Sequence, residues 1–361
     1  MRVVHLDHSS GWRGGQTQLM HLLDGSDDAV VCRTDSPLHR RLEAEKHPHT
    51  THDDWLTPWG IAALSRTIQD LQPNLIAAHT STAHGAGLRA SSLPMVVHRR
   101  VDFKPSWSSR RKYERPTGFI AVSDAVANVL RGCGVQKRRI LTVGDGVDTH
   151  AVEQAQAATD PQGWTGSSSR PCLLAVGALV DHKDHKTLLR SVARLPDVRL
   201  LLVGEGPLRG RLTRQARSLG IDNRVQILGQ RNDVFGLLKS VDLFVHPSKL
   251  EGRGQAVIEA LISGTPVVAT HAGGLPETVG DGGLLVPPER PEDLAIAIRT
   301  ALDGSENARS RARARGRQVR KWASLVNYRR QTRAAYQHFL SFTTHNDGGA
   351  IQGAGSDLND A

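Results

Sequence analysis

The stretch that most constrains the fold is residues 246–277, HPSKLEGRGQAVIEALISGTPVVATHAGGLPE. The short apolar run Leu243–His246 stops at a proline, which predicts a buried strand followed by a loop. Apolar residues at helical spacing predict a helix over 255–263, and Gly264 supplies a permissive residue just past its end. Val267–Ala269 predicts the next buried strand. This order of strand, helix and strand is typical of an α/β protein with a parallel sheet.

Two glutamates lie eight positions apart in this unit, Glu251 in the loop and Glu259 inside the helix. Because a helix rises about 1.5 Å per residue, Glu259 lies only a turn or so beyond the helix N-terminus and can face the same crevice as the loop. The N-terminus, at Gly254, Gln255 and Ala256, presents unpaired N–H groups that suit a phosphate. Carboxylates beside such a site favour hydroxyl groups as partners. A phosphate beside a polyol indicates a nucleotide sugar.

The pattern E-x7-E, set in PS-x-x-EG-x-G-x-x-x-x-EA-x-x-x-G-x-PVVAT-x-x-GG-x-PE, resembles the retaining glycosyltransferases of family 4, which have the GT-B fold. The resemblance implies that Glu251 contacts the transferred sugar and that Glu259 holds the ribose hydroxyls. Arg253 departs from the family pattern, which usually has an aromatic or other apolar residue at that position. Two solvated glutamates would be the simpler interpretation of an isolated pair, but this pair lies inside the whole pattern.

Strand and helix patterns repeat on both sides of a polar segment, and 361 residues suffice for about two domains. We therefore predict an α/β protein with two doubly wound Rossmann-like domains facing across a cleft, the GT-B arrangement. The acceptor-binding domain is expected over 1–155, a linker over 156–170, and the nucleotide-sugar-binding domain over 171–321. By the resemblance, residues 322–340 form a helix that crosses back to the first domain. The tail, 341–361, is expected to be disordered.

The first strand-to-helix turn of the chain carries Gly14 and Gly15, which allow a ligand to approach the backbone closely. In the family the equivalent Gly-Gly loop lies at the cleft, so the resemblance places both glycines there. Arg13 beside them would meet an anionic acceptor. A tight turn and a solvated arginine are the simpler alternatives.

Polar side chains follow two later strands of the first domain. His79 and His84 come after the strand predicted over 75–78, and ligands collect at the carboxyl ends of strands in open α/β sheets. The strand starting at Met95 leads into HRRVDF, where the family often has a functional histidine. The candidates for that role are His98, Arg99, Arg100 and Asp102. Ordinary hydrogen-bonded loop residues remain the alternative.

The first turn of the second domain is GALVDHKDHKTLL. The family has Gly-Arg followed by a lysine here, and these cations grip the diphosphate. By the resemblance, Gly177 and Lys183 match the glycine and the lysine, but Ala178 stands where the arginine is expected. One missing cation would weaken donor binding by about 1.5–3 kcal/mol, unless Arg253 replaces it. Backbone groups near Arg231 would border the nucleobase.

The sequence contains no Asp-x-Asp motif, in agreement with a metal-independent enzyme that needs no cofactor besides its nucleotide-sugar substrate. Lys183, a second cation and the helix N-terminus would then stabilise the leaving phosphate. Glu251 is expected to orient the sugar without attacking it, so Glu251 and Lys183 are the catalytic candidates. Two alternatives stay open: a GT-B epimerase or phosphorylase, and a nucleotide-sugar-binding protein whose catalysis Ala178 impairs.

The net charge of +10 and the pI near 10.0 favour anionic partners. No zinc-finger, RRM or KH signature accompanies this charge, so an anionic membrane surface ranks above nucleic acid. The basic segments 107–115 and 309–321 suit lipid headgroups, although solvated helices are the simpler alternative. Three scattered cysteines and the lack of a signal peptide or membrane-spanning run predict a cytoplasmic protein, peripheral at the inner membrane. By analogy, its acceptor is a glycan or lipid-linked glycan of the bacterial envelope, such as lipopolysaccharide.

Overall fold

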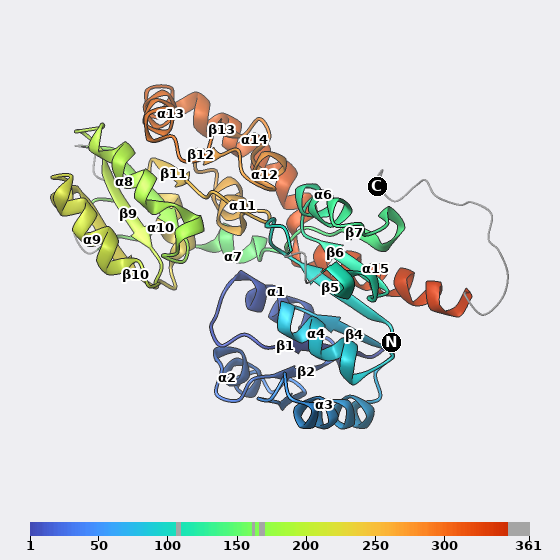
Figure 1. The fold of residues 1–361 in the computed structure, drawn as a ribbon. Helices are drawn as coiled ribbons and strands as arrows, with labels where there is room; N and C mark the ends of the chain where they lie inside the picture. The colour runs from blue at the N-terminus through green and yellow to red at the C-terminus, as the bar shows by residue number, and fades with distance from the viewer. Residues whose placement is uncertain (106–109, 161–162, 166–169, 346–361) are drawn as a thin grey trace.

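Two parallel sheets, each with helices on both faces, organise the chain (Figure 1). The computed structural model describes residues 1–105, 110–160, 163–165 and 170–345. The inner strands of both sheets are buried along nearly their whole length, as parallel strands covered by helices must be, whereas the strands at the two edges of each sheet are partly exposed.

The first sheet has seven parallel strands in the order β3-β2-β1-β4-β5-β6-β7. Its strands are β1 (Val3–Asp7), β2 (Ala29–Cys32), β3 (His49–Thr51), β4 (Leu75–Ala78), β5 (Met95–Arg99), β6 (Gly118–Ala121) and β7 (Ile140–Thr142). The helices between them are α1 (Gly14–Leu23), α2 (Pro37–Ala44), α3 (Pro58–Leu71), α4 (Ser81–Ala90), α5 (Arg110–Glu114), α6 (Asp124–Gly132) and the 3₁₀ helix η2 (Lys137–Arg139).

The second sheet has six parallel strands in the order β10-β9-β8-β11-β12-β13. Its strands are β8 (Cys172–Val176), β9 (Arg199–Val203), β10 (Val225–Gly229), β11 (Leu243–His246), β12 (Val267–Thr270) and β13 (Gly283–Val286). The helices of this unit are α7 (Thr149–Gln154), η3 (Asp181–Lys183), α8 (His185–Ala193), α9 (Arg209–Ser218), η4 (Asp222–Arg224), α10 (Val234–Ser240), α11 (Gln255–Ile262), α12 (Leu275–Val279), α13 (Pro291–Asp303) and α14 (Ser305–Ala323). In both sheets the order reverses next to the first strand of the unit, which is the Rossmann pattern.

The last helix, α15 (Leu325–His345), returns to the first sheet and packs near β6 and α1. Its buried Tyr336 and Phe339 share a core with Val3 and Ile120 of that sheet. The returning helix therefore begins at Leu325 and not at residue 322, because residue 322 belongs to α14. It also extends through residues 341–345, which the sequence assigned to the tail. The rest of that tail lies outside the described residues.

The chain passes between the two units at two neighbouring places. The Val147 N–H donates to the Ala323 carbonyl at 2.7 Å, and Val147 forms a bridge with Ser324. Helix α7, which follows the first crossing, packs on α10 and α11, and its Val152 lies in the second unit's core. The first unit therefore ends before α7 and not at residue 155, because the apolar face of α7 is covered by helices of the second unit.

Candidate active site

The candidate site lies where the order of the second sheet reverses, between the adjacent strands β8 and β11. In open α/β sheets this is the place where ligands bind, beyond the carboxyl ends of the strands. Lys183 lies in the segment after β8, and Glu251 lies in the loop after β11. The topology therefore brings together two residues that are 68 positions apart in the chain.

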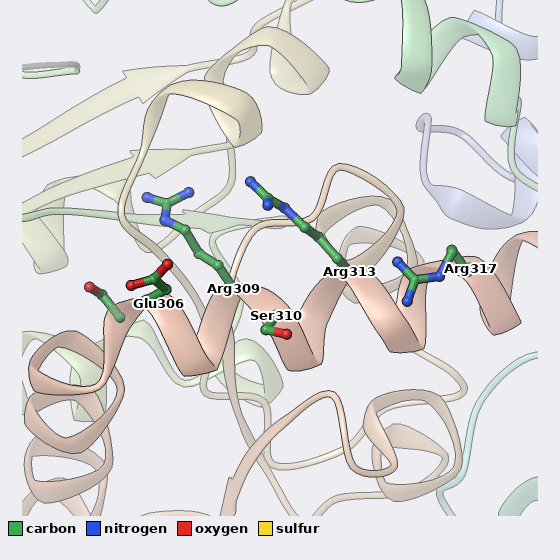
Figure 2. Close-up of a pocket in the computed structure, with 6 residues that line it drawn as sticks. Glu306, Arg309, Ser310, Arg313 and Arg317 are labelled. Atoms are coloured by element: carbon green, nitrogen blue, oxygen red, sulfur yellow. The ribbon is translucent and has the colours of Figure 1, made fainter.

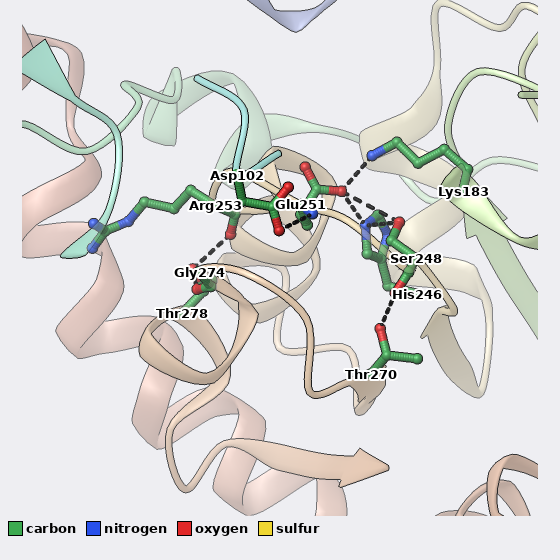
Figure 3. Close-up of polar contacts among 9 residues, drawn as sticks. All are labelled: Asp102, Lys183, His246, Ser248, Glu251, Arg253, Thr270, Gly274 and Thr278. Carbon is green, nitrogen blue, oxygen red and sulfur yellow. Dashed lines mark hydrogen bonds and ion pairs between the residues drawn. The ribbon is translucent and has the colours of Figure 1, made fainter. Parts of the chain in front are cut away.

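The Glu251 carboxylate accepts three hydrogen bonds at this edge (Figure 3). Lys183 Nζ donates to Oε2, His246 Nε2 lies 2.8 Å from the same oxygen, and Ser248 Oγ lies 3.3 Å from it. Burial alone would raise the pKa of Glu251, but the Lys183 ammonium and the His246 bond outweigh it and hold that pKa below its ordinary value. Glu251 is therefore an ionised acceptor that faces other side chains and not bulk solvent.

The second glutamate, Glu259, lies in α11 and is only 8% exposed. Its Oε1 accepts a hydrogen bond from Gln255 Nε2 at 3.1 Å. Burial raises the pKa of Glu259 to about 7, and this hydrogen bond offsets only part of the effect. A buried carboxyl with so little compensation is typical of a ligand-binding position.

The N-terminus of α11 lies between Glu251 and Glu259 in the sequence. Gly254 adopts φ 81°, a left-handed conformation that favours glycine, and the helix begins at Gln255. The first N–H groups of the helix, which include those of Gln255 and Ala256, have no carbonyl partner earlier in the helix. They can therefore meet an anion, as the sequence predicted.

The start of α1 in the first unit approaches the N-terminus of α11. A Cβ atom on Gly14 would lie 3.2 Å from Gln255 Oε1, so the starts of α1 and α11 face each other. Gly15 has open space around it. Arg13 caps α1, and its backbone N–H donates to Gln16 Oε1 at 3.1 Å. The Gly-Gly turn thus lies at the boundary between the two units.

A second contact across the boundary comes from Asp102, whose Oδ2 accepts the backbone N–H of Glu251 at 3.1 Å. His182 lies close to both units: burial lowers its pKa, and the charges of Lys183, Glu251, Arg13 and Asp102 all act on it. Charges of both units therefore act on this imidazole. His182 directly precedes the lysine that the family pattern identifies, but no motif in the sequence marks it.

Two family models match the chain, Glycosyltransferase Family 4 over residues 14–151 and Glycosyl transferases group 1 over residues 158–319. A lipopolysaccharide core biosynthesis glycosyltransferase, LpsE of Rhizobium meliloti (strain 1021), is 33% identical over 337 residues, which make up 88% of this chain and 94% of LpsE. The chain belongs to glycosyltransferase family 4. The resemblance that the E-x7-E pattern predicted is thus confirmed.

Two further comparisons place this glycosyltransferase among its relatives. A 2-deoxystreptamine glucosyltransferase of Streptomyces kanamyceticus is 27% identical over 241 residues, covering 62% of this chain and 61% of the relative. HepE of Anabaena, solved in complex with UDP, matches the structure with a TM-score of 0.82 at 24% identity, over 93% of this chain and 100% of HepE. The predicted GT-B fold is confirmed. Among the described residues, no helix of the glycosyltransferase is long and apolar enough to cross a bilayer.

The predicted acceptor residues after β4 and β5 form a buried polar network in the first domain. His79 stacks on His98 with ring centroids 4.5 Å apart, and His98 Nε2 lies 2.6 Å from the Tyr336 hydroxyl of α15. Arg100 donates to the Tyr328 hydroxyl at 3.0 Å and lies 3.2 Å from His79 Nδ1. Burial lowers the pKa of both histidines well below the ordinary value, and the charge of Arg100 adds to this effect. The network connects the first sheet to α15 and holds neutral rings.

Arg99 and His84 differ from the expected position at the cleft. The Arg99 guanidinium is buried and donates to the Tyr113 hydroxyl at 3.2 Å and to the Phe103 carbonyl. His84 Nε2 lies 3.0 Å from the Lys112 carbonyl. Both side chains therefore use their polar atoms within the first domain, because packing of α4 and α5 on the sheet encloses them.

The Arg253 side chain lies at the boundary between the two domains. Figure 3 shows its side chain extending from the loop away from Lys183, with Glu251 between them. The guanidinium donates to the Val122 carbonyl at 3.0 Å and lies 4.2 Å from the centroid of the Trp322 ring. The Arg253 side chain therefore makes a contact between the domains, and its contact with the donor phosphate stays a prediction.

The other donor candidates lie in the segments that follow β8 and β10. Gly177 lies under Lys183, since a Cβ atom on it would be 3.6 Å from the lysine side chain. The Arg231 side chain pairs with Asp233 at 2.8 and 2.6 Å, which leaves its backbone groups in the loop after β10 as the feature expected at the nucleobase. Ala178 follows Gly177 on the same turn and presents no cation.

The described residues contain a group that could hold a metal ion, made of His39, Glu43 and His49 on α2 and β3. It lies at the edge strand of the first sheet and shares no residue with the Glu251 site. His39 Nδ1 already accepts the Asp35 N–H at 3.1 Å. This group therefore gives no reason to place a metal beside the donor.

Proposed function

We propose that this glycosyltransferase moves a sugar from a nucleotide-sugar donor to a glycan or lipid-linked acceptor with retention of configuration. The acceptor belongs to bacterial envelope polysaccharide of the lipopolysaccharide type, and the enzyme works in the cytoplasm at the inner face of the membrane. The similarity to LpsE over 94% of that protein supports the acceptor class.

One observation carries this proposal. The ionised Glu251 and the cation Lys183 meet at the sheet edge where the strand order reverses, and the loop of Glu251 leads directly into the N-terminus of α11, which carries the buried Glu259. Their chemistry matches the parts of a nucleotide sugar, which are the sugar hydroxyls, the two phosphates and the ribose diol.

The roles follow from this match. Glu259 accepts hydrogen bonds from the ribose hydroxyls, and the amides at Gly254, Gln255 and Ala256 hold the phosphates. Lys183 exchanges its bond to Glu251 for the leaving phosphate, whose developing charge it stabilises. The released Glu251 carboxylate then accepts a sugar hydroxyl. The acceptor attacks from the face that the nucleotide leaves, and a phosphate oxygen takes its proton.

The reaction runs without a metal ion, because the cation and the helix N-terminus supply the positive charge that the leaving group needs. Ala178 favours one second candidate, a nucleotide-sugar-binding protein with impaired turnover, since a cation of the family pattern is missing there. Product analysis with and without acceptor also separates transfer from epimerase or phosphorylase chemistry.

An anionic membrane surface is the proposed site of action. Arg309, Arg313 and Arg317 follow one another along α14 at four-residue spacing and line a hollow of about 520 Å³ (Figure 2). Arg309 is partly paired, since its guanidinium lies 3.6 Å from Asp242. The other basic segment that the sequence analysis named includes residues 107–109, which lie outside the described residues. Each basic residue near an anionic surface contributes about 1 kcal/mol. We therefore expect the protein to sediment with phosphatidylglycerol vesicles but not with phosphatidylcholine vesicles. The double substitution R313Q/R317Q should weaken this binding.

A thermal-shift screen against UDP-, GDP- and ADP-sugars tests the donor assignment, because a ligand that binds only the folded state raises the melting temperature. HepE was solved with UDP and with UDP-glucose, so UDP-sugars come first. NMR of the product then gives the anomeric configuration, and reactions in EDTA test the metal. If none of the nucleotide sugars stabilises the protein, the proposal is wrong.

A further inference from the structure

Arg253 joins parts of the glycosyltransferase that are remote in sequence. Its guanidinium donates to the Val122 carbonyl just after β6, 131 residues away, and stacks over the Trp322 ring near the end of α14. The same guanidinium lies 3.7 Å from Glu277 Oε2. The side chain is only 13% exposed, so these contacts are shielded from water.

Glu277 extends the same contact set into the first domain. Its two carboxylate oxygens accept the backbone N–H groups of Asp124 and Ala125 at 3.1 and 2.8 Å. A carboxylate of the second domain therefore caps α6 of the first, where both the free N–H groups and the helix dipole favour negative charge. Arg253 and Glu277, both of the second domain, thus reach across the boundary to neighbouring residues of the first domain.

The loop that carries Arg253 meets the first domain at three successive residues. The Glu251 N–H donates to Asp102, and Arg253 reaches Val122. Between them, Gly252 approaches so closely that a Cβ atom on it would lie 2.1 Å from the Arg100 carbonyl oxygen. The place of the Glu251 carboxylate thus depends on how the first domain holds this loop.

We propose that Arg253 is a positioning residue for Glu251: it holds residues 251–253 against the first domain through Val122, Trp322 and Glu277. The inference rests on the proposed function, in which Glu251 receives the transferred sugar. It assigns Arg253 to the geometry of the sugar site and not to the donor phosphates. Loss of Arg253 then impairs turnover and leaves nucleotide affinity nearly unchanged.

The test compares Arg253→Met, Arg253→Lys and Glu277→Gln with Arg299→Met, a control that removes an arginine from the surface pair with Asp197. For Arg253→Met we expect kcat to fall roughly 10- to 100-fold, the effect of one charged hydrogen bond, with the Kd for nucleotide within about 3-fold of wild type. Arg253→Lys keeps a cation over the Trp322 ring and should recover part of kcat. Glu277→Gln should resemble Arg253→Met, and the control should match wild type.

Hydrogen exchange provides a readout that needs no activity. Amides of 251–254 and of 122–127 should exchange faster in Arg253→Met and Glu277→Gln than in wild type, while β9 exchanges at the same rate. Unchanged exchange in both segments would refute the proposal. A nucleotide Kd at least 10-fold weaker, with kcat at saturating donor preserved, would show instead that Arg253 binds the donor phosphates. If wild-type protein transfers no sugar, the proposed function fails, and exchange and nucleotide affinity still decide the role of Arg253.

Discussion

Replacing Glu259 with glutamine should stabilise the ligand-free enzyme at alkaline pH and weaken its affinity for nucleotide. The carboxyl is 8% exposed, and burial raises its pKa from 4.5 to about 7. The folded protein therefore binds this proton more tightly than the unfolded chain does. Stability falls as the pH rises from about 4.5, where the unfolded chain ionises, to about 7, where the folded protein does.

The size of the effect follows from the two pKa values. One pKa unit corresponds to about 1.4 kcal/mol, so the raised pKa of Glu259 costs the folded protein about 3 kcal/mol at pH 8 and less than about 1 kcal/mol at pH 5, where the buried carboxyl is still protonated. Glutamine carries no charge at either pH and can keep a hydrogen bond with Gln255. Glu259→Gln should therefore raise the free energy of unfolding by up to about 3 kcal/mol at pH 8, with little gain at pH 5.

Urea unfolding at pH 5 and pH 8 measures this difference, and Glu43→Gln is a matched control because the Glu43 side chain is 58% exposed. The control should change stability by about 0.5 kcal/mol or less. In Glu259→Gln, nucleotide affinity should fall roughly 10-fold or more, because the ribose loses a charged acceptor. A Glu259→Gln protein that is no more stable than wild type at pH 8, or equally stabilised at both pH values, would refute the reasoning.

Three other predictions concern the donor and the domain boundary. Nucleotide-sugar affinity should rise between pH 6 and pH 8, because only the ionised Glu259 accepts two ribose hydroxyls; calorimetry in buffers of different ionisation enthalpy should show proton release, and a flat profile would argue against ribose at this residue. Ala178→Arg should tighten donor binding roughly 10-fold by restoring a cation, and an unchanged Kd would mean that no cation is missing. Gly252→Ala should lower the free energy of unfolding by about 1–3 kcal/mol because its Cβ would meet the Arg100 carbonyl oxygen, whereas Gly132→Ala, in open space, should cost far less; equal effects in urea unfolding would contradict the close approach.

Local patterns in the sequence were sufficient for much of the fold. Alternating strands and helices predicted two Rossmann-like domains, and the E-x7-E stretch predicted the strand, loop and helix that carry Glu251 and Glu259. Helix α2 and strand β3 were not predicted. Strand β3 has only the three residues His49–Thr51, which include no apolar run that could reveal it. Periodicity detects elements that bury a long face, and short edge strands do not.

The position of Arg253 could not be predicted for a different reason. In the sequence, this arginine is unusual for the family and a cation is missing at Ala178. The two observations together led to the prediction that Arg253 replaces that cation. The actual partners, Val122 and Trp322, are 131 and 69 positions away. The histidine network of the first domain could not be predicted for the same reason, because only the order of the strands brings His79 beside His98. Such contacts follow from topology and side-chain direction, which no local pattern contains.

The paired crossings at Val147 and Ala323 have a mechanical consequence. Because both connections between the lobes are bonded to each other, through a single 2.7 Å hydrogen bond and a backbone bridge, they behave as one pivot. A rotation of the lobes that keeps this bond must have its axis close to Val147, and the two connections cannot separate without breaking it. The Arg253 side chain packs against Gly144, close to Val147, so such a rotation would move it less than residues far from the axis. The contacts that hold residues 251–253 against the first domain would therefore persist in a rotation that separates remoter parts of the two lobes.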